Sequence, residues 1–164
     1  MSEMRRKDRE MDIDFAYSIV DKAEFATIST LNEDGSAYCI PISVARQDDK
    51  IYIHSAYKGR KIENIKRNPK VCMSFVGDVK VPPPVKKEEV EEFMGSIGKL
   101  MSKKFTTEYE STVVFGTAYI VEQRDEKILG LKLICEKYVP ENMPYFNAAI
   151  EASLERTCVI RIDI

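Results

Sequence analysis

The sequence has no tryptophan, only one histidine, and no CxxC pair among its four cysteines. A zinc site of the usual spacing needs clustered Cys and His ligands, so no metal site is predicted. Each cysteine lies among apolar residues, as buried free cysteines commonly do. We therefore expect reduced core side chains at Cys39, Cys72, Cys135 and Cys158.

Long apolar runs and an excess of either charge are also missing. No run approaches the roughly 20 apolar residues that span a bilayer, and the basic N-terminus is not followed by the apolar segment of a secretory signal. With 25 basic and 27 acidic residues the net charge is -2, so no global field attracts nucleic acid or an anionic membrane. These absences predict a cytoplasmic protein that binds neither, and 164 residues predict a single domain, 1–164.

Several sequence signatures of enzymes are absent as well: GxGxxG, GxxxxGK[ST], HExxH and GxSxG. A Ser-His-Asp triad would have to use His54, which lies beside Ser55 with no evident acid partner. Acyl-transfer chemistry is therefore disfavoured.

Alternating apolar and polar residues predict strands joined by short turns. The turn at Asn32–Gly35 places Gly where a hairpin needs a positive φ, and Pro41 predicts an edge, a bulge or a ligand-facing position within its strand. Short turns favour antiparallel pairing, so we expect a mainly β fold, a six-stranded antiparallel barrel with peripheral helices. The predicted strands are Phe25–Leu31, Ala37–Ala45, the segment from Ile51, Val71–Val76, Ser111–Val121 and Thr157–Ile164.

Helical periodicity and capping residues predict the peripheral helices. The expected helices are one capped by Asp12 or Asp14, a short one after Gly59 that stops at Asn68-Pro69, one from a cap at Asp125 through Tyr138, and one over Tyr145–Ser153. An insertion at about residues 79–104 begins with a proline run and continues as an amphipathic helix. We expect it to pack on the barrel, either as a lid over a site or simply as a cover for the core.

The segment His54–Lys61 runs from a strand into a Gly-Arg-Lys turn that opens a helix. Free N–H groups and the helix dipole favour an anion at such a start. Ser55 can donate a hydroxyl, Arg60 suits bidentate contact with a phosphate, and Lys61 adds a point charge. The alternative is a solvated basic turn, and spacing alone leaves both interpretations open.

The same segment, His54-Ser55-Ala56-x-x-Gly59-Arg60-Lys61 with Ile65 and Asn68-Pro69-x-Val71, resembles the signature of the pyridoxamine 5′-phosphate oxidase-like flavoproteins, which have the FMN-binding split-barrel fold. Three further stretches match: Ala26–Thr30 with Gly35, Ile40–Ser43, and Thr106–Gly116. The resemblance runs from about Asp12 to Tyr138 and is greatest to the nitroimidazole-resistance (Nim) branch.

The resemblance implies a role for each matching residue. Arg60 and Lys61 would bind the FMN phosphate with Ser55, the strand from Cys39 to Val44 would run beside the isoalloxazine ring, and His54 would lie near the cofactor. Ser111 would come from the second subunit, because flavin sites in this family lie at a homodimer interface. The cofactor-binding residues so implied are Ile40, Pro41, Ile42, Ser43, His54, Ser55, Gly59, Arg60, Lys61 and Ser111.

The activity so implied is that of an FMN-dependent oxidoreductase, a Nim-like reductase or a relative of pyridoxamine phosphate oxidase, acting on an unidentified small molecule with NAD(P)H as a candidate reductant. His54 is the best candidate for a proton donor, although it could equally position the flavin. True pyridoxamine phosphate oxidases hold their substrate with basic C-terminal residues, and Arg161–Ile164 does not match that pattern. The resemblance therefore disfavours oxidation of vitamin B6. Two alternatives are a non-catalytic flavin-binding or carrier module, and a haem protein with His54 as axial ligand.

Overall fold

A computed structural model describes residues 4–92 and 97–164 and contains one antiparallel sheet of seven strands. The order across the sheet is β2-β1-β5-β6-β7-β4-β3. The prediction of a mainly β, antiparallel fold with peripheral helices is confirmed, but the predicted number of six strands was wrong. The strands are β1 (Ala26–Leu31), β2 (Ala37–Ile42), β3 (Ala45–Gln47), β4 (Lys50–Ser55), β5 (Lys70–Lys80), β6 (Glu108–Ile120) and β7 (Cys158–Asp163).

The extra strand arises because the predicted strand Ala37–Ala45 divides into β2 and β3 at Ser43-Val44. The N–H of the fully buried Val44 donates to the Tyr138 hydroxyl (3.0 Å), and that hydroxyl donates to the Val44 carbonyl (3.2 Å). One side chain thus satisfies backbone groups that would otherwise pair in a ladder.

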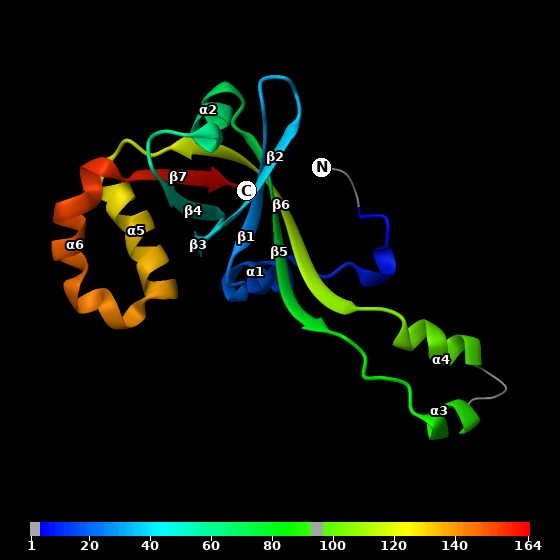
Figure 1. Ribbon diagram of the computed structural model, residues 1–164. Coiled ribbons are helices and arrows are strands. Elements are labelled where there is room, and N and C mark those ends of the chain that lie inside the picture. The colour runs from blue at the N-terminus through cyan, green and yellow to red at the C-terminus, as the bar shows by residue number, and fades with distance from the viewer. Residues whose placement is uncertain (1–3, 93–96) are drawn as a thin grey trace.

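This division shapes the whole sheet. The strands β2 and β3 are consecutive in the chain yet form its opposite edges, so the two-residue link brings the edges close together and the sheet curls (Figure 1). Across the described ranges β2 and β3 share no hydrogen-bonded ladder, so the curled sheet is not closed there. Of the three positions predicted for Pro41, an edge, a bulge or a place facing a ligand, the structure shows the edge.

The helices of the described ranges lie outside the curled sheet, and several of them pack against it (Figure 1). They are α1 (Ile13–Lys22), α2 (Arg60–Arg67), α3 (Lys87–Glu92), α4 (Ile97–Lys104), α5 (Arg124–Tyr138) and α6 (Phe146–Ser153), with short 3-10 turns η1 (Lys7–Arg9), η2 (Pro140–Tyr145) and η3 (Leu154–Arg156). One apolar cluster fills the sheet against α1 and α2, and a second lies beneath α5 and α6. None of the helices in the described ranges is long and apolar enough to cross a membrane.

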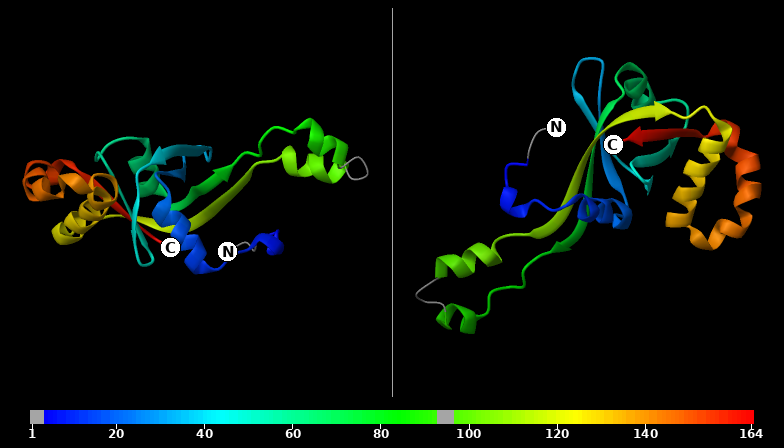
Figure 2. Two further views of the ribbon diagram at one scale, coloured as in Figure 1. Left: turned by 90° about the horizontal axis from the view of Figure 1, so that it is seen from below. Right: turned by 180° about the vertical axis from the view of Figure 1, so that it is seen from behind.

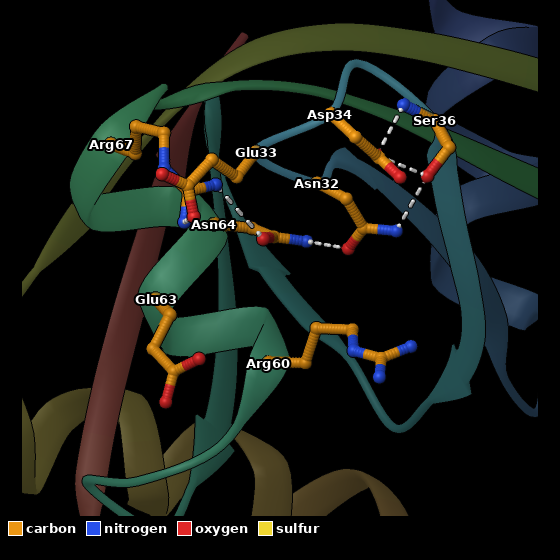
Figure 3. A pocket seen from close by; sticks show the side chains of 8 residues that line it. All are labelled: Asn32, Glu33, Asp34, Ser36, Arg60, Glu63, Asn64 and Arg67. Carbon is orange, nitrogen blue, oxygen red and sulfur yellow. Dashed lines mark hydrogen bonds and ion pairs between the residues drawn. The ribbon is translucent and has the colours of Figure 1, made fainter.

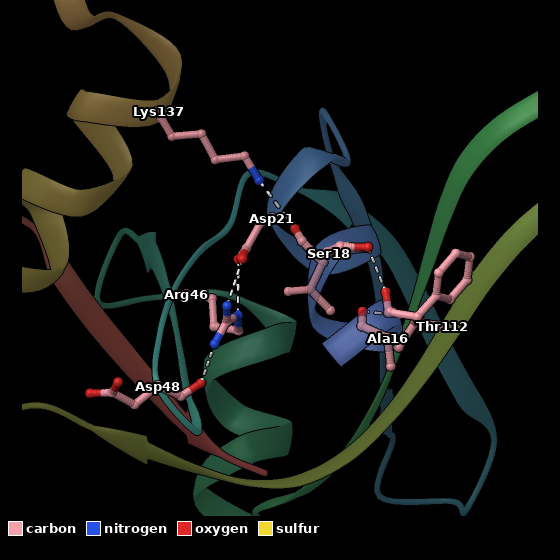
Figure 4. A network of polar contacts seen from close by, with 9 residues as sticks. Ala16, Ser18, Asp21, Arg46, Asp48, Thr112 and Lys137 are labelled. Atoms are coloured by element: carbon pink, nitrogen blue, oxygen red, sulfur yellow. Dashed lines mark hydrogen bonds and ion pairs between the residues drawn. The ribbon is translucent and has the colours of Figure 1, made fainter. Parts of the chain in front are cut away.

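Helix α1 is fixed at both ends by polar contacts, of which Figure 4 shows those of its middle and its C-terminal end. Of the two predicted candidates for its cap, Asp12 and Asp14, it is Asp12 that caps the helix, accepting the Phe15 N–H at 2.8 Å. Near its C-terminus Asp21 accepts two hydrogen bonds from Arg46 (2.9 and 2.6 Å), and Lys137 of α5 donates to the Val20 carbonyl (3.3 Å). The helix therefore joins β3 and α5 to the sheet.

The strands β5 and β6 extend well beyond the rest of the sheet as a two-stranded ribbon, with a register shift between Val76 and Val79. Helices α3 and α4 lie at the end of this ribbon, away from the curled sheet (Figures 1 and 2). The expectation that the insertion at about 79–104 packs on the barrel was therefore wrong, because mutual pairing carries both strands outward. Part of the predicted amphipathic helix falls in residues 93–96, outside the described ranges.

Two smaller expectations also change. Helix α5 begins one residue before Asp125 and has Gln123 at its N-cap, so Asp125 lies in the first turn and does not cap it. All four cysteines are free, but only Cys158 is fully buried, and Cys39 is exposed on the edge strand β2. The exposed position follows from the alternation of β2, whose residues Ile40 and Ile42 face the core while Cys39 points to the outer face.

Candidate functional site

Helix α2 starts from a backbone that only glycine adopts readily. Gly59 is its N-cap with φ 120°, and no side chain caps the helix. The first hydrogen bond of the helix joins the Glu63 N–H to the Gly59 carbonyl (3.1 Å). In the parts of the chain that the structure describes, the N–H groups of Arg60, Lys61 and Ile62 therefore point out of the helix start without a partner, which leaves donors for an anion.

Lys61 is the unusual side chain here. It is only 9% exposed, yet among the described residues it makes no hydrogen bond and no ion pair. Burial lowers the pKa of its ammonium group. No fully buried side-chain nitrogen or oxygen of the described chain lacks a partner, so the ammonium group still reaches solvent. A buried cation without a counter-ion is costly, and an anionic ligand would offset that cost.

Lys61 lies near the paired ends of β4 and β7. Partial burial and then the charge of Lys61 lower the pKa of His54, so the imidazole is neutral at pH 7. Burial raises the pKa of the Cys158 thiol, against the opposing charges of Lys127 and Lys61. His54 and Cys158 lie on adjacent strands, where Ser55 pairs with Cys158. The structure thus places Lys61 close to His54 and to Cys158, the residue that pairs with Ser55.

Arg60 turns toward different neighbours. Its guanidinium lies over the Tyr38 ring, 5.2 Å from the centroid. It lines a pocket of about 700 Å³ between α2 and the β1–β2 hairpin, together with Glu33, Asp34 and Glu63 (Figure 3). The three carboxylates outnumber the two guanidinium groups of the pocket, those of Arg60 and Arg67, and this net negative charge disfavours a phosphate there. Arg60 and Lys61 therefore do not share a set of partners in the structure, although the exposed Arg60 side chain can change rotamer.

Asn64 holds α2 against the hairpin, a role that sequence reasoning missed. Its side-chain amide donates to Thr30 Oγ1 and Asn32 Oδ1, both at 3.0 Å, and it is 2% exposed. The spacing of Lys61, Asn64 and Ile65 is i, i+3, i+4, which places the three on one helix face. That periodicity was the signal for both buried polar residues.

The strand residues predicted to face the flavin ring lie at the sheet edge. Ile40 and Ile42 are half-buried against the core, whereas Pro41 is exposed opposite Thr27. Ser43 is half-buried in the link to β3. This edge offers a planar ligand an unpaired strand.

Ser111 lies elsewhere. It is exposed on β6 opposite Val76, toward the ribbon. Its side chain contributes to a site at α2 only if a second copy of the chain brings it there, which is what the resemblance implies.

Arg161 of β7 is bound by acids. It donates to Asp163 (2.6 Å) and Glu126 (3.0 Å) and lies 5.0 Å from the Tyr119 ring centroid. These carboxylates raise its pKa, while burial and then Glu126 raise the pKa of Tyr52 to about 12. Arg161 therefore already has its counter-ions within the chain.

Comparisons with known proteins agree on the fold. A family model described as pyridoxamine 5′-phosphate oxidase matches residues 15–164, whereas no curated protein sequence matches the chain. A proposed 5-nitroimidazole antibiotic resistance protein from Bacteroides thetaiotaomicron superposes with a TM-score of 0.72 at 20% identity, covering 94% of this chain and 80% of that one.

Two other solved structures are similar in fold. The flavocytochrome Anf3 from Azotobacter vinelandii has a TM-score of 0.72 at 17% identity, over 94% of this chain and 64% of that one. An FAD and haem binding protein from Mycobacterium smegmatis has a TM-score of 0.70 at 17% identity, over 94% and 67% of the two chains. At these identities the likeness shows a common fold.

Proposed function

The chain belongs to the pyridoxamine 5′-phosphate oxidase family, and from this premise we propose that it is a flavoprotein that binds FMN at the start of α2. The observation that carries the proposal is Lys61, a buried cation with no partner in the described chain beside three unpaired N–H groups. A phosphate supplies the missing negative charge and accepts from both kinds of donor.

The surrounding residues fit the rest of the cofactor. Ser55 offers a hydroxyl at the end of β4, opposite Cys158, which lies near Lys61. The exposed Arg60 can turn from Tyr38 to the phosphate. The edge of β2 around Pro41 gives the isoalloxazine ring an apolar neighbour, with backbone groups that no further strand pairs. The flavin, when bound, supplies the redox chemistry, and the neutral His54 can donate to it or accept from it. The activity that follows is a Nim-like reductase or related oxidoreductase of a small molecule, with NAD(P)H as reductant.

The second element of the proposal is a homodimer. On the outer face of β6 the alternate residues Val113, Phe115 and Tyr119 are 54%, 52% and 45% exposed. The ribbon continues this apolar surface through Val76, Val79 and Tyr109, at 51%, 57% and 64%. A two-stranded ribbon alone is marginally stable in water. A second copy would cover this continuous surface and deliver Ser111 to the flavin site.

The test is FMN binding by the purified protein, followed by visible absorbance and flavin fluorescence. Bound FMN that is reduced by NADH or NADPH and reoxidised by a nitroaromatic compound supports the enzyme, and bound FMN without turnover supports a carrier. A colourless protein that takes up no added FMN contradicts the proposal. Lys61→Met should weaken FMN binding, and Lys132→Met is its matched control, since Lys132 is an exposed lysine on α5 whose ion pair in the described chain is with Glu136.

Haem is a second candidate, favoured by the solvent-accessible, neutral imidazole of His54, which could be an axial ligand. The neighbouring Lys61 could pair with a haem carboxylate. Two structural relatives, a flavocytochrome and an FAD and haem binding protein, support it. If the protein takes up no flavin but shows a Soret band that His54→Ala abolishes, the cofactor is haem and not FMN.

A further inference from the structure

A second pocket lies on the other side of the loop that joins β4 to α2. It has a volume of about 460 Å³ and lies between the end of β6, the start of α5 and the turn before β7. Ile120, Val121 and Leu154 give it an apolar wall. Tyr57, 43% exposed, contributes an aromatic ring from the loop. None of these residues belongs to the proposed flavin site.

Lys127 lies at the base of this pocket and is only 6% exposed. Its ammonium group donates to the Leu154 carbonyl (2.8 Å) and the Tyr57 hydroxyl (3.0 Å), and lies 5.5 Å from the Tyr57 ring centroid. These acceptors are all uncharged, and one ammonium N–H is left over. Lys127 and Lys61 are the two charged side chains that are buried in the described chain, and neither has a carboxylate partner.

The other charges of the pocket do not neutralise Lys127. Lys66 and Arg124 add two cations, and Glu122 and Glu155 add two carboxylates, all of them exposed. No ion pair joins any of these side chains in the described part of the chain. The pocket therefore has three cations against two carboxylates, with the one buried charge positive.

We propose that this pocket binds a small organic anion. Its carboxylate would accept from the free N–H of Lys127 and from the guanidinium of Arg124, and its apolar body would lie on Ile120 and Val121 beside the Tyr57 ring. A carboxylate replaces the counter-ion that the buried ammonium lacks, and hydrogen bonds between ions are stronger than those to neutral groups. The site depends on neither FMN nor a second copy of the chain.

Benzoate is a suitable probe, with benzamide as its neutral counterpart of the same shape. Binding is measured by ligand-observed NMR and calorimetry, on the protein as purified and again after addition of FMN. We expect benzoate to bind at least about tenfold more tightly than benzamide, with or without FMN, because a charged hydrogen bond is stronger than a neutral one.

Three variants locate the site. Arg124→Gln removes an exposed cation at little risk to folding and should lower the affinity for benzoate at least about tenfold. Lys127→Met, if it folds, should lower that affinity by a similar factor. Lys61→Met and the control Lys132→Gln should leave benzoate affinity unchanged. Absence of benzoate binding, equal binding of benzamide, an unchanged affinity in Arg124→Gln, or a loss in Lys61→Met would each overturn the proposal. If the protein binds benzoate but not FMN, the anion site proposed here stands and the proposed flavin-binding function is refuted.

Discussion

Cations lie near both ends of β7, but those near its start have no carboxylate partner in the described chain, whereas the one toward its end has two. Near Cys158, at its start, the buried Lys61 and Lys127 have no carboxylate partner in the described chain. Toward its end, Arg161 is held by Asp163 and Glu126. The pKa values diverge accordingly: burial lowers that of Lys61, and hydrogen bonds to carboxylates raise that of Arg161.

The difference separates a structural cation from one kept for a ligand. Arg161 joins β7 to α5, and its partners belong to the chain itself. Lys61 is desolvated without such partners, which destabilises the fold slightly and leaves the charge available. Variants at the two ends should therefore act on different properties.

The largest expected effect is on FMN binding at the first end. Arg60→Ala with Lys61→Ala removes two cations from the proposed phosphate site, and each charged hydrogen bond contributes about 1.5–3 kcal/mol. The affinity for FMN should fall by roughly 10²- to 10⁴-fold in a fluorescence titration. Lys132→Ala should bind FMN like the wild type. A folded double variant with unchanged affinity would refute the phosphate site.

A smaller effect, on stability, is expected at the second end. Arg161→Met leaves Glu126 and Asp163 without their cation, so the free energy of unfolding should fall by about 1–2 kcal/mol, a value held down by the partial exposure of all three side chains. Urea unfolding measures the change. The affinity for FMN should stay the same. A large loss of FMN affinity with unchanged stability would show that Arg161 serves the ligand and not the fold.

The pH dependence of stability gives a third comparison. The folded-state pKa of Lys61 lies below its ordinary value of 10.5, so between these two values the unfolded chain binds more protons. The contribution of Lys61 to the free energy of unfolding therefore rises with pH through this window. Without flavin, Lys61→Met should be more stable than the wild type near neutrality, and the gap should narrow toward pH 10.5. A gap independent of pH would show that Lys61 is not desolvated.

The smallest expected effect is a change in the pKa of His54. Its titration is easy to follow by NMR because the sequence has no other histidine. Its pKa should lie below its ordinary 6.5, because of burial and then the charge of Lys61. Lys61→Met removes the second cause and should raise the pKa, whereas Arg161→Met should not move it. A value unaffected by Lys61→Met would mean that the two side chains lie further apart than the structure has them.

Local signals predicted much of the fold. Asp12 caps α1 through its own first turn, and Gly35, with φ 80°, makes the first hairpin. The split between β2 and β3 could not be read locally, because it depends on Tyr138, 94 positions from Val44. The ribbon was missed for the same reason, since β5 and β6 are each extended only by pairing with the other.

The candidate site was predicted in part. The Gly59 turn and the closeness of Lys61 to His54 follow from a strand that runs directly into a helix. Arg60 and Lys61 were expected to act as a pair, but adjacent positions on a helix point about 100° apart. Lys127 gave no sequence signal, because its burial depends on Tyr57 and Leu154, which are distant in the chain.

The most direct test of the unpaired Lys61 is the single variant Lys61→Met, with stability and FMN affinity measured on the same preparation. The account predicts opposite changes: a rise of about 1 kcal/mol in the free energy of unfolding without flavin, and a loss of FMN affinity of roughly tenfold to a hundredfold. A less stable flavin-free protein, or an unchanged affinity for FMN, would contradict it.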